Sequence, residues 1–249
     1  MWPPAADVRV RLQPRWDAAV AALWREELAA ASSDLAALAE EAERQGDDGS
    51  LPYTFAHLTL AECLAGRLEA AAAHAARGRE IAEQVQAEGE LAFLLAVEAL
   101  VDAHRGRSEA AGRRGAAAAA AGRATGLHAA VVVGTGAVGL AALGEGRPTD
   151  ARAAMAPVVG ELLERGVRDP AAARLVPDLI EAQLAEDPGG ASPLQDAWDA
   201  MAAASGRPWP LGTAARCRGL RHALAGDLPA ARRELEGAVA LLRLSLIHI

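Results

Sequence analysis

The feature that most constrains this chain is a glycine that returns at intervals of 20 residues. Eight glycines lie on one 20-residue grid: Gly46, Gly66, Gly106, Gly126, Gly146, Gly166, Gly206 and Gly226. Glycine adopts the left-handed backbone conformation that ends a helix without the steric penalty of other residues. The grid therefore predicts a succession of helices joined by tight turns. Glu26, Gln86 and Glu186 occupy the other grid positions between residues 26 and 226.

Two further columns group these helices in pairs. Six positions before every second grid position stands an aliphatic residue: Val20, Leu60, Leu100, Leu140, Ile180 and Leu220. Five positions after it stands an alanine: Ala31, Ala71, Ala111, Ala151, Ala191 and Ala231. A large side chain on one helix opposite alanine on the next lets the two axes approach closely. We therefore predict an all-α fold, an α-solenoid of tetratricopeptide-like helical hairpins with a 40-residue period, over residues 1–243.

Two stretches depart from this pattern. Near the start of the chain, Glu26 stands in the glycine position, which favours one continuous helix over residues 16–45. Further along, residues 186–193 (EDPGGASP) replace the tight turn with a longer loop. We expect the helix after this loop to begin near Pro193, because proline is well placed in the first helical turn.

Composition restricts the core and the class of partner. Alanine occupies 65 of the 249 positions and aromatic residues are 3%, which favours close-packed helices over sheets. The net charge of −8 argues against nucleic-acid binding and against an anionic membrane as partner. Cys63 and Cys217 give no disulfide framework and no metal-ligand spacing, which is typical of a reducing compartment. The N-terminus lacks the apolar segment of a secretory signal, so we expect a cytoplasmic protein.

A competing signal lies at residues 131–139 (VVVGTGAVG). Gly134, Gly136 and Gly139 have the G-x-G-x-x-G spacing of a dinucleotide-binding turn after a strand. No βαβ alternation or acidic residue follows at the required distance, so we predict a helix that binds no dinucleotide. Residues 124–144 are also uncharged and long enough to cross a bilayer. Their leucine content is low, and we predict a buried solenoid helix instead.

The polar residues form no recognisable catalytic or metal site. The histidines have no metal-ligand spacing, and we expect them at the surface or partly buried: His57, His74, His104, His128 and His222. Arg216 and Arg218 flank Cys217 and could lower its pKa, although a packing role is favoured. The sequence contains two groups of arginines: Arg105, Arg107, Arg113 and Arg114, and Arg216, Arg218 and Arg221. They form either an anion-binding patch or solvated helix faces, and the acidity of the chain favours solvated faces. Without lysine, a standard P-loop is impossible. We predict no catalytic, cofactor-binding or metal-binding residue and no enzymatic activity.

Four stretches carry a resemblance to one family. They are residues 46–53 (GDDGSLPY), residues 57–67 (HLTLAECLAGR), residues 174–182 (RLVPDLIEA) and residues 206–220 (GRPWPLGTAARCRGL). Together they resemble the helical-repeat region of large ATP-binding LuxR-type (MalT-like) transcriptional regulators of actinobacteria. In that family a nucleotide-binding domain precedes the repeats, a LuxR-type helix-turn-helix follows them, and the repeats act as sensor and self-association scaffold. Residues 134–139 and 187–193 depart from the family's leucine-rich helix and tight turn.

The resemblance implies a non-catalytic sensor or scaffold fragment of such a regulator. Its partner would be a protein or a small-molecule inducer, with no direct binding of nucleic acid and no membrane. It implies no cofactor in this chain, with ATP expected in an upstream domain. A free-standing tetratricopeptide-like protein-interaction adaptor is the alternative function.

The end of the sequence differs from the rest. Residues 244–249 (LSLIHI) hold half of the chain's four isoleucines and match the translation of a transposon-end adapter used in sequencing libraries. We therefore expect a non-native tail at residues 244–249 and a repeat fragment that ends near Arg243. Leu235, Val239 and Leu242 have helical spacing just before it. If no further helix covers this apolar stripe, it would favour self-association.

Overall fold

The computed structural model describes residues 13–187 and 193–245, which are largely helical and include no β-strand. The helices are α1 (Pro14–Trp24), α2 (Leu28–Gln45), α3 (Leu51–Leu64), α4 (Leu68–Gln84), α5 (Glu88–His104), α6 (Ser108–Thr125), α7 (His128–Gly144), α8 (Pro148–Glu164), the 3₁₀ helix η2 (Pro170–Ala173), α9 (Val176–Glu186), α10 (Pro193–Ser205), α11 (Pro208–Leu224) and α12 (Leu228–Ser245). Each α-helix packs against the next, and α3, α5, α7, α9 and α11 also contact one another in succession. The predicted all-α, solenoid-like architecture is confirmed, while the 40-residue period stays a prediction.

The turns fall where the glycine grid places them. All eight grid glycines have left-handed φ angles, from 63° at Gly206 to 80° at Gly226. The turn at Gly66 shows how the helix end is closed, because the N–H of Arg67 donates to the carbonyl of Glu62 at 2.9 Å. This hydrogen bond satisfies one of the carbonyls that a helix end leaves free. The conformational freedom of glycine thus accounts for the regular helix lengths.

The expected continuous helix over residues 16–45 is wrong. α1 ends at Trp24 and α2 begins at Leu28, with Glu26 between them in the left-handed region at φ 67°. The N–H of Glu27 donates to the carbonyl of Ala22 at 2.9 Å, the same closing bond as in the glycine turns. Gln86 is the other non-glycine residue in this conformation among the described residues, at φ 54°. In the later loop, the described part of α10 begins at Pro193, as expected.

Small residues bring neighbouring helices close together. Four residues of the alanine column have no exposed surface: Ala31, Ala71, Ala111 and Ala151. Ala231 is 4% exposed, and Ala191 lies outside the described residues. Gly115 of α6 faces Gly134 of α7 so closely that a Cβ on Gly134 would lie 2.7 Å from the Gly115 carbonyl oxygen. The G-x-G-x-x-G stretch is therefore part of helix α7, as predicted, and one of its glycines allows two helices to touch.

Helix α7 also carries the uncharged run that is long enough to cross a bilayer. Within the described ranges, the structure contains no helix that is both long and apolar enough to span a membrane.

An aromatic cluster joins α1, α3 and α5. The ring of His57 lies 4.5 Å from that of Tyr53 and 5.2 Å from those of Trp16 and Phe93, centroid to centroid. His57 is 3% exposed, so the expected surface or partly buried position is wrong for this histidine. Burial lowers its pKa to about 4, and its Nδ1 hydrogen-bonds the carbonyl oxygen of Tyr53 at 2.9 Å. A neutral imidazole surrounded by rings is a packing group, not a ligand.

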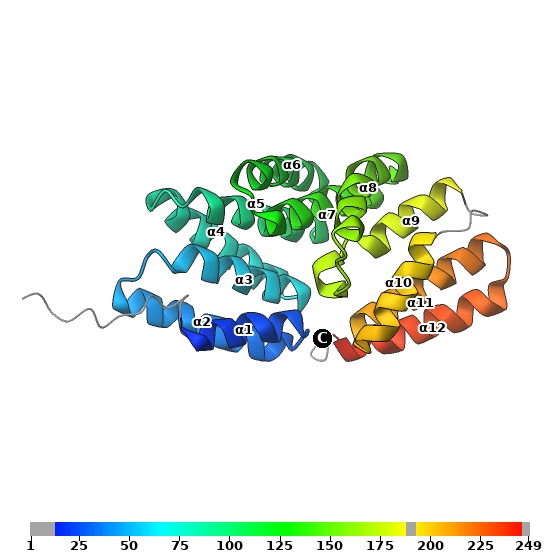
Figure 1. Cartoon of the computed structure of the whole chain (residues 1–249), viewed down its shortest axis with the longest axis horizontal. Helices are drawn as coiled ribbons and strands as arrows, with labels where there is room; N and C mark the ends of the chain where they lie inside the picture. Colours follow the sequence, from blue (N-terminus) through cyan, green and yellow to red (C-terminus); the bar gives the residue numbers. More distant parts are fainter. Residues whose placement is uncertain (1–12, 188–192, 246–249) are drawn as a thin grey trace, which may run out of the picture.

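The array bends into an arch whose two limbs meet (Figure 1). Helices α1 to α4 form one limb and α9 to α12 form the other. The limbs are joined directly, because the Arg207 guanidinium donates to the backbone carbonyl of Trp24, 183 positions away in sequence. The arch therefore encloses an interior space.

The expected apolar stripe on α12 is mostly covered. Leu235 packs against Gly219 of α11 and Leu242 against Gly212, because neither glycine has a Cβ to exclude it. Val239 is 49% exposed and is the member of the stripe that faces solvent. α12 continues through Leu244 to Ser245. Residues 246–249 of the expected tail lie outside the described residues.

Candidate functional site

The interior of the arch holds a cavity of about 570 Å³, within the usual range for small-molecule sites. Its wall is built by α3, α5 and α7 on one side and by η2, α9 and α11 on the other, and the α1–α2 turn and Leu242 of α12 also contribute. Three members of the aliphatic column, Leu60, Leu100 and Leu140, line it with Val132 and Val133. Most of the wall is thus apolar, as in sites that bury a hydrophobic ligand.

One glycine of the α7 motif faces this cavity. A Cβ on Gly136 would meet the Cβ of Leu175 at 3.6 Å, an ordinary contact distance. The glycine motif therefore divides between two roles, since Gly134 closes on α6 while Gly136 leaves space open.

The polar end of the cavity is formed by three residues from distant parts of the chain. Arg174 follows η2, Trp209 begins α11, and Glu26 lies in the α1–α2 turn. The guanidinium carbon of Arg174 lies 4.0 Å from the centroid of the Trp209 ring, a cation–π contact. One guanidinium nitrogen lies 3.5 Å from Oε1 of Glu26. This group is named the Glu26–Arg174–Trp209 cluster.

Glu26 is unusual in both backbone and side chain. A left-handed φ costs a non-glycine residue about 1–2 kcal/mol, and such residues concentrate at functional sites. Its side chain is only 4% exposed, and neither carboxylate oxygen has a hydrogen-bond partner among the described residues. Burial raises its pKa, while Arg174, Arg207 and the nearby backbone N–H of Trp209 oppose the shift. The Trp209 N–H lies close enough to favour the carboxylate without the geometry of a hydrogen bond.

Arg174 is held by the ring and the ion pair rather than by hydrogen bonds. Desolvation lowers its pKa to about 10, against the opposing effect of the Glu26 charge. Its side chain keeps 21% exposure toward the cavity. A guanidinium carries five N–H donors in a planar fork, so this residue can serve an acceptor inside the cavity.

A second ion pair lies in the wall, although the buried Nε of Arg216 has no hydrogen-bond partner among the described residues. A guanidinium nitrogen of Arg216 donates to Asp178 at 3.1 Å, and another lies 3.2 Å from Glu181. Burial raises the pKa of Asp178 and the Arg216 charge opposes the rise. This pair ties α9 to α11 and positions the wall.

The two cysteines are unreactive packing groups. Burial raises the pKa of the Cys63 thiol in the cavity wall to about 12. It also raises the pKa of Cys217 to about 12, so the lowering expected from Arg216 and Arg218 is wrong. Cys217 is completely buried, and its thiol donates to the carbonyl of Pro177 at 3.6 Å. The favoured packing role is consistent with this position.

The cavity wall also includes His104 and His128. Burial lowers the pKa of His104, and Nε2 of His128 lies 2.8 Å from a guanidinium nitrogen of Arg165. Among the described residues, no three His, Cys, Asp or Glu side chains are grouped as a metal site would require. His57, His74 and His222 are not among the residues that line this cavity.

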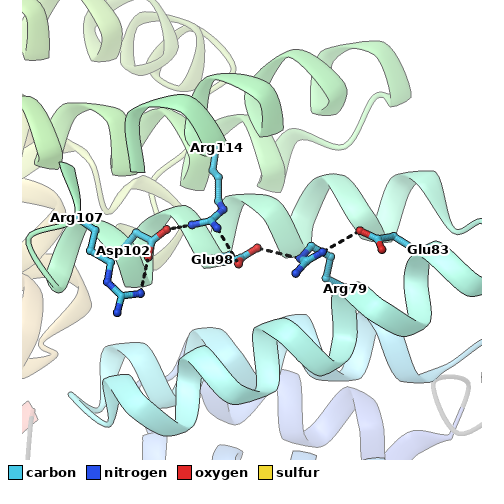
Figure 2. Close-up of polar contacts among 6 residues, drawn as sticks. All are labelled: Arg79, Glu83, Glu98, Asp102, Arg107 and Arg114. Carbon is cyan, nitrogen blue, oxygen red and sulfur yellow. Dashed lines mark hydrogen bonds and ion pairs between the residues drawn. The ribbon is translucent and has the colours of Figure 1, made fainter. Parts of the chain in front are cut away.

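The two groups of arginines, for which solvated helix faces were favoured over an anion-binding patch, are largely engaged in ion pairs. Figure 2 shows that Arg79 and Arg114 reach Glu98 at 3.4 and 3.5 Å, while Arg114 and Arg107 both pair with Asp102. These carboxylates on α5 are largely buried, so the face is neither an anion site nor simply solvated. Three of the other arginines are paired as well: Arg105 with Glu69, Arg113 with Glu109, and Arg218 with Asp199 and Glu234; Arg221 has no ion pair among the described residues. Glu109 lies one turn before Arg113 on the same helix, whereas Glu69, Asp199 and Glu234 lie on other helices, which the sequence alone does not reveal.

Sequence reasoning identified none of the cluster as a site. Arg174 and Trp209 lie in two of the stretches that carry the family resemblance, and Cys63 lies in another. Glu26 was visible as an exception to the glycine grid. These sequence features mark the residues one by one, but only the curvature of the arch brings the residues together in space.

The sequence matches no family model, and no curated protein is similar to it.

Proposed function

We propose that this chain is a non-catalytic helical-repeat sensor that binds a small, largely apolar molecule in the central cavity. The observation that carries the proposal is the cavity itself, which has aliphatic walls and one polar cluster with unused hydrogen-bonding capacity. Such a combination of an apolar pocket and a few convergent polar groups is the usual form of a ligand site. A solenoid used only as a rigid adaptor has no need of it.

The proposal extends to the setting of the module. The resemblance supports a place within a LuxR-type, MalT-like transcriptional regulator, where the repeats sense an inducer. ATP binding and DNA reading would then belong to other modules, and this chain would bind neither. Occupancy would be transmitted through the joint between Arg207 and Trp24, because that joint borders the cavity.

The test is binding of a neutral apolar fluorophore, N-phenyl-1-naphthylamine, to the 249-residue chain. Trp24 and Trp209 line the cavity and provide an independent fluorescence signal. Gly136→Leu places a side chain in the cavity, and we expect it to weaken dye binding by about tenfold or more. Gly160→Leu is the matched control, because a Cβ there has no neighbour within 4 Å.

Both variants must retain the far-ultraviolet circular dichroism of the parent. Equal dye affinity in the parent and Gly136→Leu would contradict the proposal and favour the protein-interaction adaptor. Gly136→Ala, a smaller insertion into the same space, is the second variant if Gly136→Leu fails to fold.

A further inference from the structure

Arg174 is the member of the Glu26–Arg174–Trp209 cluster that a ligand can reach, and the inference drawn from it rests on the proposed function. Its side chain is 21% exposed and lines the cavity, and none of its N–H groups donates a hydrogen bond within the described part of the chain. Glu26 differs, because its side chain is 4% exposed and both carboxylate oxygens are covered by protein atoms. Glu26 therefore sets the charge beside Arg174 but cannot accept a hydrogen bond from a ligand.

Two polar side chains of α11 also line the cavity, and both are engaged within the protein. Arg216 lies 3.1 Å from Asp178 and 3.2 Å from Glu181, and its remaining Nε is buried. The Thr213 hydroxyl donates to a main-chain carbonyl of its own helix at 3.0 Å. Arg174 is thus the charged donor in the wall that is left for a ligand.

The ion pairs at and beside the wall carry an excess of negative charge. They comprise four carboxylates and three guanidiniums: Glu26 with Arg174, Asp169 with Arg207, and Asp178 and Glu181 with Arg216. A ligand carboxylate would leave water to enter this excess, and the attraction of Arg174 is already weakened by Glu26 at 3.5 Å. Desolvation of an ion is recovered only by a strong, well-placed partner, so an anionic head group is disfavoured. A cationic head group is disfavoured by the charge of Arg174 itself.

A neutral acceptor avoids both penalties. Its oxygen would receive charge-assisted hydrogen bonds from Arg174, which are stronger than neutral ones, without removal of another full charge from water. A head group with its own N–H or O–H donor would find no acceptor in the cluster, because the oxygens of Glu26 are covered. Such an unsatisfied donor costs free energy when it is buried.

We infer that the cavity binds a neutral amphipathic molecule whose head group is a carbonyl acceptor without a donor, such as an alkyl ketone or ester, and that Arg174 selects it. The carbonyl oxygen accepts from the guanidinium, which is held 4.0 Å from the centroid of the Trp209 ring. The apolar tail extends along Leu60, Leu100 and Leu140. No covalent bond is made or broken, so the complex is reversible.

The experiment is displacement of the bound dye by two probes of the same shape, 2-nonanone and 2-methyl-1-nonene, in which a methylene group replaces the carbonyl oxygen. The alkene leaves water more readily, so the probes are compared by the effect of a variant and not by their absolute affinities. Arg174→Met removes the N–H donors and keeps an unbranched apolar side chain. We expect it to weaken binding of the ketone by about tenfold or more and that of the alkene by less than about twofold.

Three further variants control for folding and charge. Arg168→Met removes an exposed arginine that does not line the cavity, and should leave both affinities unchanged. Arg174→Gln keeps N–H donors without the charge and should retain part of the ketone binding, which a merely structural role would not explain. If Arg174→Met does not fold, its combination with Glu26→Gln removes both charges of the ion pair and is compared with Glu26→Gln alone. Gln86 shows that glutamine adopts the left-handed φ of such a turn.

Nonanoate and nonylamine test the charge of the head group. In the parent chain at about pH 7, where both are ionised, we expect 2-nonanone to bind at least about tenfold more tightly than either. Glu26→Gln removes one negative charge and should strengthen binding of nonanoate. The same variant should leave the affinity for the ketone within about twofold, because the oxygens of Glu26 touch no ligand.

The outcomes separate this inference from the proposed function. Dye binding that depends on Gly136, with equal effects of Arg174→Met on the ketone and the alkene, would overturn the head-group inference alone. Tightest binding by nonanoate or nonylamine in the parent chain would do the same. Dye binding that is insensitive to Gly136→Leu would instead refute the cavity function on which the inference rests.

Discussion

Helix α7 has two faces that are packed in opposite ways. On one face, Gly134 meets Gly115 of α6 with no room for a Cβ; two residues later, Gly136 faces open cavity. The same contrast extends through the molecule, with His57 and Cys217 enclosed by neighbouring side chains while Cys63 borders the empty space. The comparison teaches that small residues serve both to close helix contacts and to hold a cavity open.

The largest expected effect concerns the thiols on the two sides of this comparison. Burial raises the pKa of both Cys63 and Cys217 to about 12 from an ordinary value of 9.0. Since the thiolate is the reacting species, modification by a disulfide reagent at about pH 8 should be roughly a thousandfold slower in the folded chain than in guanidinium. Cys63→Ala and Cys217→Ala allow each thiol to be followed alone. A Cys63 rate close to the unfolded one would show that the cavity is wet.

Acid should destabilise the folded chain through protonation of the buried His57. Its folded pKa of about 4 lies below its ordinary 6.5, so the unfolded chain binds the proton first as pH falls. Stability should therefore be lost between pH 6.5 and pH 4, by about 3 kcal/mol from this residue. Urea unfolding of the parent and of His57→Phe across this range measures the difference. His104→Phe, on the cavity side, should flatten the profile much less than His57→Phe.

Gly134 and Gly136 of α7 should respond to alanine with opposite signs. Gly134→Ala forces a methyl group against the Gly115 carbonyl and should destabilise the chain by about 2 kcal/mol. Gly136→Ala meets only an ordinary contact and gains helix propensity, so it should stabilise by up to about 1 kcal/mol. Thermal unfolding by circular dichroism tests both, and destabilisation by both variants would break the comparison.

The smallest effect separates the two non-glycine turns. Gln86→Gly relieves a left-handed residue in an exposed turn and should stabilise by about 0.5–1 kcal/mol at any pH. Glu26→Gly relieves the same strain and also removes a carboxylate whose pKa is raised by burial. Its advantage over Gln86→Gly should therefore appear as pH rises above about 4.5 and vanish in more acidic solution. Parallel pH dependence of the two variants would contradict the buried state of Glu26.

The sequence predicted the turns well because their cause is local. A left-handed φ favours glycine wherever it occurs, so the grid of glycines marks the helix ends directly. The turn at Glu26 was not predicted, because a glutamate does not favour a left-handed φ and the backbone hydrogen bonds that close this turn leave no sequence signal. The ion pairs of Arg114 and Arg216 were also out of reach, since their partners lie on neighbouring helices.

The candidate site could not be predicted for a related reason. Each helix pair contributes a few leucines that read as ordinary core positions in the sequence. The cavity exists only because small rotations between successive helices add up until α1 reaches α11. Such accumulated curvature depends on every interface in the array and has no local sequence pattern.

The contact between Arg207 and Trp24 changes how such an array should come apart. In an open solenoid each unit touches only its neighbours, so unfolding can spread from either end while the rest stays folded. Here the hydrogen bond between Arg207 and Trp24, 183 positions apart, and the ion pair between Arg174 and Glu26 both join the two limbs, and losing these contacts frees both ends of the array together. Because contacts this distant in sequence form late in folding, the arch should close last and open first. The cavity is then the part of the protein that opens most readily, and a bound ligand would stabilise the closed arch.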